Sequence, residues 1–210
     1  MTLLLFCTFL CLSLGIIFSL ASKIIWLYFG GEDITPDTDL YWIKSQIMGF
    51  RFSLGAIIIG AIFSYIQKEK LFQEERNKNK DILSMVIGAI CFLICIILPR
   101  DLDIIAFAAA FVYIAYVYLP FAVQTARVSR TLEKGTYQSA FKYLTVMAIS
   151  FMLIFLCFLL DKVINSILRA QTGVIHGYSV FYYLGWALAL GGMWSAYLGY
   201  IRPGGENREG

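Results

Sequence analysis

Two pairs of cysteines are spaced so that each pair lies on one face of a helix. Cys7 precedes Cys11 by four residues, and Cys91 precedes Cys95 by four, which is about one helical turn. Thiolates from two such helices would offer the sulfur ligands that a soft metal prefers. Both pairs lie in strongly apolar segments, where a cysteine thiol behaves as a small hydrophobic side chain. We therefore predict no metal site and assign these cysteines no role.

Arg51 is the only full charge that lies clearly inside an apolar segment. It is about one turn from the end of that segment, so its guanidinium can extend toward the membrane interface. Asp101, Asp103 and Asp161 are predicted to lie at the same level. The simpler interpretation is an ion pair that anchors the helix, and the alternative is a charge that lines an outward-facing vestibule.

A third polar group lies in the segment 104–123, where Tyr113 and Tyr116 precede Pro120. A proline in a spanning helix frees a backbone carbonyl, which neighbouring groups must then satisfy. A kink at this point would shape a cavity with tyrosine hydroxyls on its wall. The simpler interpretation is an interfacial aromatic cluster beside a tolerated proline.

The chain has one histidine, His176, and five cysteines that all lie in apolar segments. A single imidazole cannot supply both axial ligands of a haem, and we find no recognisable set of nucleophile, base and orienting acid. No basic patch is interleaved with stacking aromatics, which argues against nucleic-acid binding. We predict neither an enzyme nor a cofactor.

Six apolar segments position these side chains. A bilayer core of about 30 Å needs roughly 20 apolar residues per helix, and a chain of 210 residues that is 60% hydrophobic is too apolar for a soluble domain. We predict an all-α, polytopic transmembrane helix bundle, formed as one domain over 1–202 with a flexible cytoplasmic tail at 203–210. The six predicted spans are 3–22, 47–66, 82–98, 104–123, 143–160 and 180–200.

Small residues recur every four positions on the second and sixth segments. Such spacing lets two helix backbones approach closely, which in lipid replaces the missing hydrophobic force between helices. We favour packing within the chain, and the alternative is an interface with other copies or with a partner subunit. The residues are Ala56, Gly60 and Ser64 on the second segment and Ala187, Gly191, Ser195 and Gly199 on the sixth.

The distribution of lysine and arginine predicts the orientation. Of the 17 basic residues, most fall in the two connections 67–81 and 124–142 and in the tail. Because cytoplasmic loops are enriched in Lys and Arg, we predict that both termini are cytoplasmic, in a plasma membrane or bacterial inner membrane. The connection 67–81 is interpreted as helix extensions with a solvated turn, the alternative being a cytoplasmic docking surface, and 124–142 is interpreted as a loop with a short interfacial helix near Tyr137 and Phe141.

Ionisable groups are scarce within the spans, and coupled transport normally requires acids there. We therefore predict a non-catalytic integral membrane protein that serves as a structural or accessory subunit, or as a scaffold, of a membrane assembly. The alternative is a small homo-oligomeric channel or transporter with a hydroxyl-lined path, because a passive pore needs no buried charge. The predicted partners are the lipid bilayer and other membrane subunits or copies of the chain.

Overall fold

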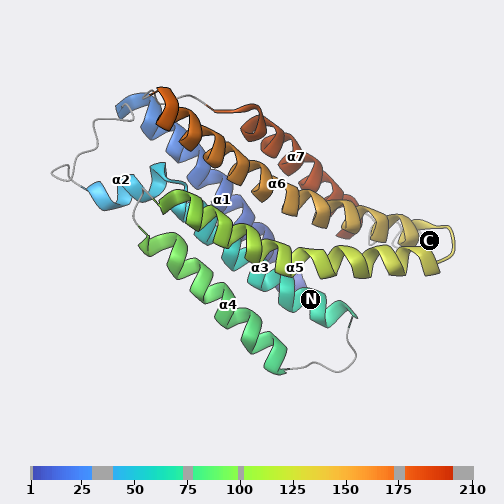
Figure 1. Cartoon of the computed structure of the whole chain (residues 1–210). Coiled ribbons are helices and arrows are strands. Elements are labelled where there is room, and N and C mark those ends of the chain that lie inside the picture. The colour runs from blue at the N-terminus through green and yellow to red at the C-terminus, as the bar shows by residue number, and fades with distance from the viewer. Residues whose placement is uncertain (1, 30–39, 73–77, 99–101, 173–177, 201–210) are drawn as a thin grey trace. The chain divides into compact units, whose positions relative to one another are not determined.

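The computed structural model describes residues 2–29, 40–72, 78–98, 102–172 and 178–200. Within these ranges every regular element is a helix, which confirms the predicted all-α class (Figure 1). The helices are α1 (Thr2–Phe29), α2 (Tyr41–Met48), α3 (Arg51–Phe72), α4 (Lys78–Ile97), α5 (Asp103–Thr131), α6 (Thr136–Thr172) and α7 (Val180–Tyr200). The predicted tail at 203–210 lies outside the described residues.

Four of these helices, α1, α4, α5 and α6, are long and apolar enough to cross a membrane. Helices α2 and α3 meet this criterion together, but they are bent by 64° at the break between them. Helix α7 coincides with the sixth predicted segment, yet it is not among the four because its tyrosines, tryptophans and glycines lower its hydropathy. Each predicted segment overlaps a helix, but the prediction of one continuous span at 47–66 is wrong, because α2 ends at Met48 and α3 begins at Arg51. Within the described residues the six predicted spans are reduced to four, or to five if the bent pair is counted as one.

The chain forms two compact units, Met1–Tyr113 and Ile114–Gly210. In the first unit, α3 packs closely against α1. The Ser53 hydroxyl donates a hydrogen bond of 2.8 Å to the Gly15 carbonyl, and a Cβ added at Gly60 would lie 3.1 Å from the Cβ of Cys11. Small side chains on both helices thus allow the close backbone approach typical of membrane helices.

Helix α4 packs against another side of α3. A Cβ on Gly55 would lie 2.9 Å from the ring of Phe92, and a Cβ on Gly88 would lie 2.8 Å from Ile62. From Gly55 to Ile62 the chain advances along α3, while the residues they contact on α4 go from Phe92 back to Gly88. The two helices are antiparallel, and α3 is enclosed on two sides.

The second unit contains the rest of α5 with α6 and α7, and α6 and α7 run side by side (Figure 1). Their contact repeats every seven residues, the spacing that keeps one helix face against its partner. Each step of seven along α7 matches a step of seven back along α6, so the antiparallel pair stays in register. A Cβ added to Gly185, Gly192 or Gly199 would lie 2.9, 2.9 and 2.6 Å from Phe158, Phe151 and Leu144 respectively.

The connection at 124–142 differs from the predicted loop. Helix α5 continues to Thr131, and α6 already begins at Thr136, so only residues 132–135 form the turn. Hydroxyls at the polar end of α5 are satisfied within the helix by bonding back to carbonyls of the preceding turn: Thr125 donates to Phe121 at 2.9 Å and Ser129 donates to Ala126 at 2.9 Å. The predicted short interfacial helix is instead the first two turns of α6.

Candidate functional site

Arg51, which opens α3, is a buried charge of the first unit. Its side chain is 3% exposed and forms an ion pair of 2.5 Å from Nη2 to Oδ1 of Asp103, which is 16% exposed. Its Nη1 donates a second hydrogen bond of 2.9 Å to the carbonyl of Cys95. Arg51 therefore joins the start of α3 to the end of α4 and the start of α5. Hydrogen bonds to a charged donor of this kind are among the stronger ones in proteins.

The bend between α2 and α3 places Arg51. Phe50 adopts a left-handed conformation with φ of 60°, which non-glycine residues rarely do. Lys23 of α1 places its Nζ 5.1 Å from the centre of the Phe50 ring, a cation–π contact. The Ser22 hydroxyl lies 3.4 Å from the Met48 carbonyl. Two side chains of α1 thus contact the chain on both sides of the bend.

The other two acids predicted at this level have different surroundings. Asp101 lies outside the described residues. Asp161 belongs to the second unit, where it is buried and its Oδ1 accepts a 2.8 Å hydrogen bond from the Ser179 backbone N–H. Because Ser179 directly precedes α7, this bond fixes where the chain enters that helix. Burial, together with the neighbouring Tyr182 and Asp161, raises the pKa of Tyr178 to about 12.

The tyrosines of α5 do not share one environment. Tyr113 is fully buried, and its hydroxyl donates to the Ser84 carbonyl at 3.3 Å. A Cβ on Gly88 would lie 2.7 Å from that hydroxyl, so the glycine makes room for it. Tyr116 and Pro120 are both exposed. Tyr113 therefore packs into α4, whereas the other two members of the predicted cavity lie on the surface of α5.

The small residues of the sixth predicted span divide between two faces of α7. Ser195 and Gly199 are buried, whereas Ala187 and Gly191 are exposed, and a Cβ on Gly191 would meet nothing within 4 Å. On α3, Gly60 is buried against α1, and Ala56 and Ser64 are partly exposed. The small residues predicted as one stripe recur every four positions, whereas the glycines of α7 that contact α6 recur every seven.

All five cysteines are free thiols. Cys95 is fully buried, and its Sγ lies 3.5 Å from the Ala106 carbonyl. Among the residues with described positions, no cluster of three or more His, Cys, Asp or Glu side chains could hold a metal ion. The described cysteines thus pack as small side chains.

Sequence reasoning missed a buried polar cluster at the end of α3. Lys68 and Glu69 form a 3.0 Å ion pair with side chains only 6% and 4% exposed, and Lys68 Nζ lies 4.3 Å from the centre of the Tyr65 ring. Asp81 at the start of α4 is also buried. The predicted helix extensions are present, because α3 continues to Phe72 and α4 begins at Lys78, but their side chains Lys68, Glu69 and Asp81 are buried. The predicted turn at 73–77 lies outside the described residues. The spacing of Tyr65, Lys68 and Phe72 on one helix face is the signal for burial.

Over the residues that the structure describes, the chain is all-helical, with four helices suited to a membrane, or five with the bent pair. Buried Arg51 is paired with Asp103, and buried Lys68 is paired with Glu69. No family model, no curated protein and no solved structure matches the chain.

Proposed function

We propose that this chain is a non-catalytic integral membrane protein, an accessory subunit or scaffold of a membrane assembly. In this proposal it crosses a plasma membrane six times, counting the bent α2–α3 pair as one span and α7 as another. Both termini are cytoplasmic in this proposal, because the segments 67–81 and 124–142 and the tail then carry their basic residues on the inner side.

The outer face of α7 carries this proposal. Five of its exposed residues recur with steps of four, three, four and three, the spacing of a helix that packs against another helix along its length. The opposite face of α7 uses steps of seven against α6. These five exposed residues are Tyr183, Ala187, Leu190, Trp194 and Tyr197, and Val180, Leu184 and Gly191 of α7 are exposed as well.

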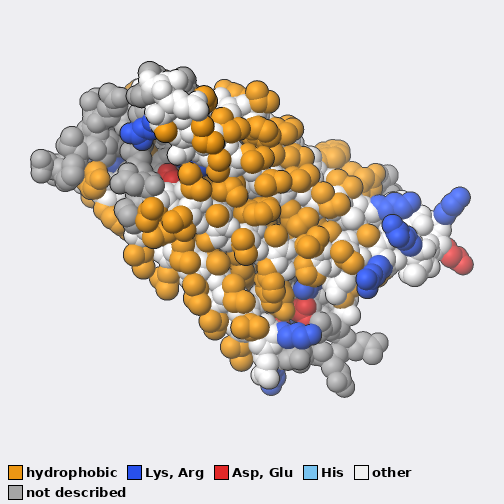
Figure 2. All heavy atoms as spheres, in the orientation of Figure 1, with side chains coloured by type: hydrophobic (Ala, Val, Ile, Leu, Met, Phe, Trp, Pro, Cys, Tyr) orange, Lys and Arg blue, Asp and Glu red, His pale blue; other side chains and the backbone are white. Residues whose placement is uncertain are grey.

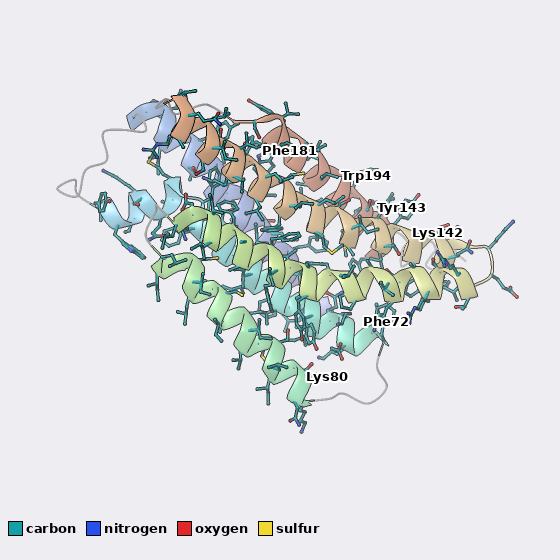
Figure 3. The ribbon with its side chains drawn as sticks, in the orientation of Figure 1. Phe72, Lys80, Lys142, Tyr143, Phe181 and Trp194 are labelled. Carbon is teal, nitrogen blue, oxygen red and sulfur yellow. The ribbon has the colours of Figure 1, made fainter. Side chains whose placement is uncertain are left out.

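The chemistry of that face favours protein over lipid. The rings of Trp194 and Tyr197 lie 5.8 Å apart, and aromatic side chains are enriched in protein interfaces. Gly191 leaves an open notch beside them, into which a side chain of another helix can insert. Figure 3 labels Trp194 on α7.

The state of Arg51 supports a structural role rather than a catalytic one. Both of its Nη atoms make contacts within the first unit, one to Asp103 and one to a carbonyl. A guanidinium so engaged positions helices, and it is not presented to a substrate.

The test is native mass spectrometry of the chain, gently extracted from its own membrane, with co-purifying chains identified. A stoichiometric partner is expected. Trp194→Ala on the α7 face should lose that partner, whereas Leu93→Ala, at an exposed apolar position of α4, should retain it. A chain that is monomeric and partner-free under these conditions would contradict the proposal.

A channel or transporter is the second candidate, and the bend between α2 and α3 favours it. Transporters form binding sites at breaks in their helices, and the 64° break here is adjacent to the buried Arg51. A closed homo-oligomer together with ion or solute flux in liposomes would favour this function. Flux that persists in Arg51→Gln would exclude a path at the bend.

A further inference from the structure

The hairpin between α5 and α6 concentrates the positive charge of the chain. It carries Arg127, Arg130, Lys134 and Lys142 against one acid, Glu133, which leaves a formal charge of +3. That equals the net charge of all 210 residues, so the rest of the chain is balanced. Figure 2 shows basic side chains gathered at this end of α5 and α6.

The basic side chains of the hairpin are open to the surroundings. All four are exposed. Arg127, Arg130 and Lys134 form no ion pair with any residue in the described ranges. Lys142 donates a long 3.4 Å hydrogen bond from its Nζ to Oε1 of Gln138. Their charges are therefore available to an outside anion.

The packing of α5 on α6 sets the height of each charge. The Thr145 hydroxyl donates to the Thr125 hydroxyl at 2.9 Å, and the rings of Tyr118 and Phe151 are 5.4 Å apart. This antiparallel register places Arg127 level with Lys142. Arg130 then lies about 4.5 Å further out, at 1.5 Å per residue, and Lys134 lies in the turn. The cations thus form successive layers beyond the apolar part of the helices.

We propose that the α5–α6 hairpin binds the phosphate headgroups of anionic phospholipids. Both helices are among those apolar enough to cross a membrane, so the charged layers follow the hydrocarbon directly. Tyr143 lies next to Lys142 at this end of α6 (Figure 3), and Tyr137 is 58% exposed. Tyrosines sit at headgroup level, and lysine or arginine within a Debye length of an anionic surface is attracted to it.

The basic segment at the α3–α4 connection differs and supplies a matched control. Its Lys68 is buried and paired with Glu69, and Asp81 adds a second buried acid. Three of its lysines, Lys70, Lys78 and Lys80, are exposed. Removing those three charges changes the net charge as much as removing three from the hairpin.

The experiment titrates phosphatidylglycerol into the detergent-solubilised full chain and counts bound lipids by native mass spectrometry. Phosphatidylcholine with the same acyl chains is the neutral comparison, and inorganic phosphate is the headgroup without tails. The variants are Arg127→Gln/Arg130→Gln/Lys134→Gln and the control Lys70→Gln/Lys78→Gln/Lys80→Gln. Thermal unfolding in phosphatidylcholine is the check that both variants are folded. Both should fold, because all six substituted side chains are exposed.

We expect the chain to prefer phosphatidylglycerol, with a preference that weakens as salt is raised. Each removed charge should lower the preference for phosphatidylglycerol about fivefold. The preference should therefore fall about a hundredfold in the hairpin variant and much less in the control. Equal loss in both variants, or an unchanged preference in the hairpin variant, would overturn the proposal. The proposal would also be overturned if inorganic phosphate bound as tightly as the lipid, or if a polyglutamate peptide displaced the lipid.

Discussion

Two neighbouring glycines of α7 should respond in opposite ways to the same substitution. Gly192 faces α6, and a Cβ there would lie 2.9 Å from Phe151 and 3.1 Å from Ser150. Phe151 cannot move aside easily, because its ring packs edge-on against Tyr118. A Cβ on Gly191 would meet nothing within 4 Å. Alanine therefore fits at 191 and is crowded at 192.

The magnitude follows from two opposing effects. Replacing a glycine in a helix interior with alanine stabilises the helix by about 1 kcal/mol, whereas overpacking a filled interface costs about 1–3 kcal/mol. Gly191→Ala should thus raise the free energy of unfolding by up to about 1 kcal/mol. Since the backbone effect is common to both variants, Gly192→Ala should lie about 1–3 kcal/mol below Gly191→Ala.

The assay is reversible unfolding of the full chain in mixed micelles, with the denaturing detergent as the variable. Gly199→Ala is a second crowded variant, because its Cβ would lie 3.2 Å from the Ala140 backbone oxygen, which cannot rotate away. If all three variants have the same free energy of unfolding, the seven-residue register of α6 and α7 is wrong.

Three further predictions concern polar side chains. Arg51→Met should destabilise the chain by up to about 3–5 kcal/mol because the carboxylate of Asp103, which is only 16% exposed, loses the guanidinium that pairs with it. Arg51→Met/Asp103→Leu should recover most of this loss in a double-mutant cycle, and additive losses would contradict the pairing. Tyr113→Phe removes one buried hydrogen bond and should cost about 1 kcal/mol in the same unfolding assay, while a loss above roughly 3 kcal/mol would show that the hydroxyl has other essential partners. The folded state raises the pKa of Tyr178 from 10.0 to about 12, so the folded chain binds this proton more tightly and stability should fall as pH rises from 10 to 12. Tyr178→Phe should have a shallower fall over that interval, and an unchanged slope would contradict the assigned shift.

The positions of the helices follow well from the sequence, because long apolar runs predict them directly. The predicted range 180–200 coincides with α7, and 82–98 falls within one residue of the end of α4. The break at Gly49 and Phe50 could not be predicted in the same way. It depends on tertiary contacts, such as Lys23 over the Phe50 ring, which apolar periodicity does not encode.

The sequence shows which charged residues are candidates for a site, but it does not show which of them pair with one another. Arg51 and three acids were singled out, and the structure pairs Arg51 with Asp103, a choice that depends on how α3 and α5 pack. The burial of Lys68 and Glu69 was missed because alternating charges usually indicate a solvated segment. Here the two charges neutralise each other, so they can be buried at the end of an apolar helix.

Helix α6 runs without interruption over 37 residues, which corresponds to about 55 Å at 1.5 Å per residue. The hydrocarbon core is about 30 Å thick, so a substantial part of such a rod stands outside it. A continuous rod that pivots in the middle of the bilayer moves its two ends together in opposite directions, by about 5 Å for a tilt of about 10°. Because helix tilt adjusts to bilayer thickness, a thicker or thinner membrane would reposition the hairpin at one end and Asp161 nearer the other.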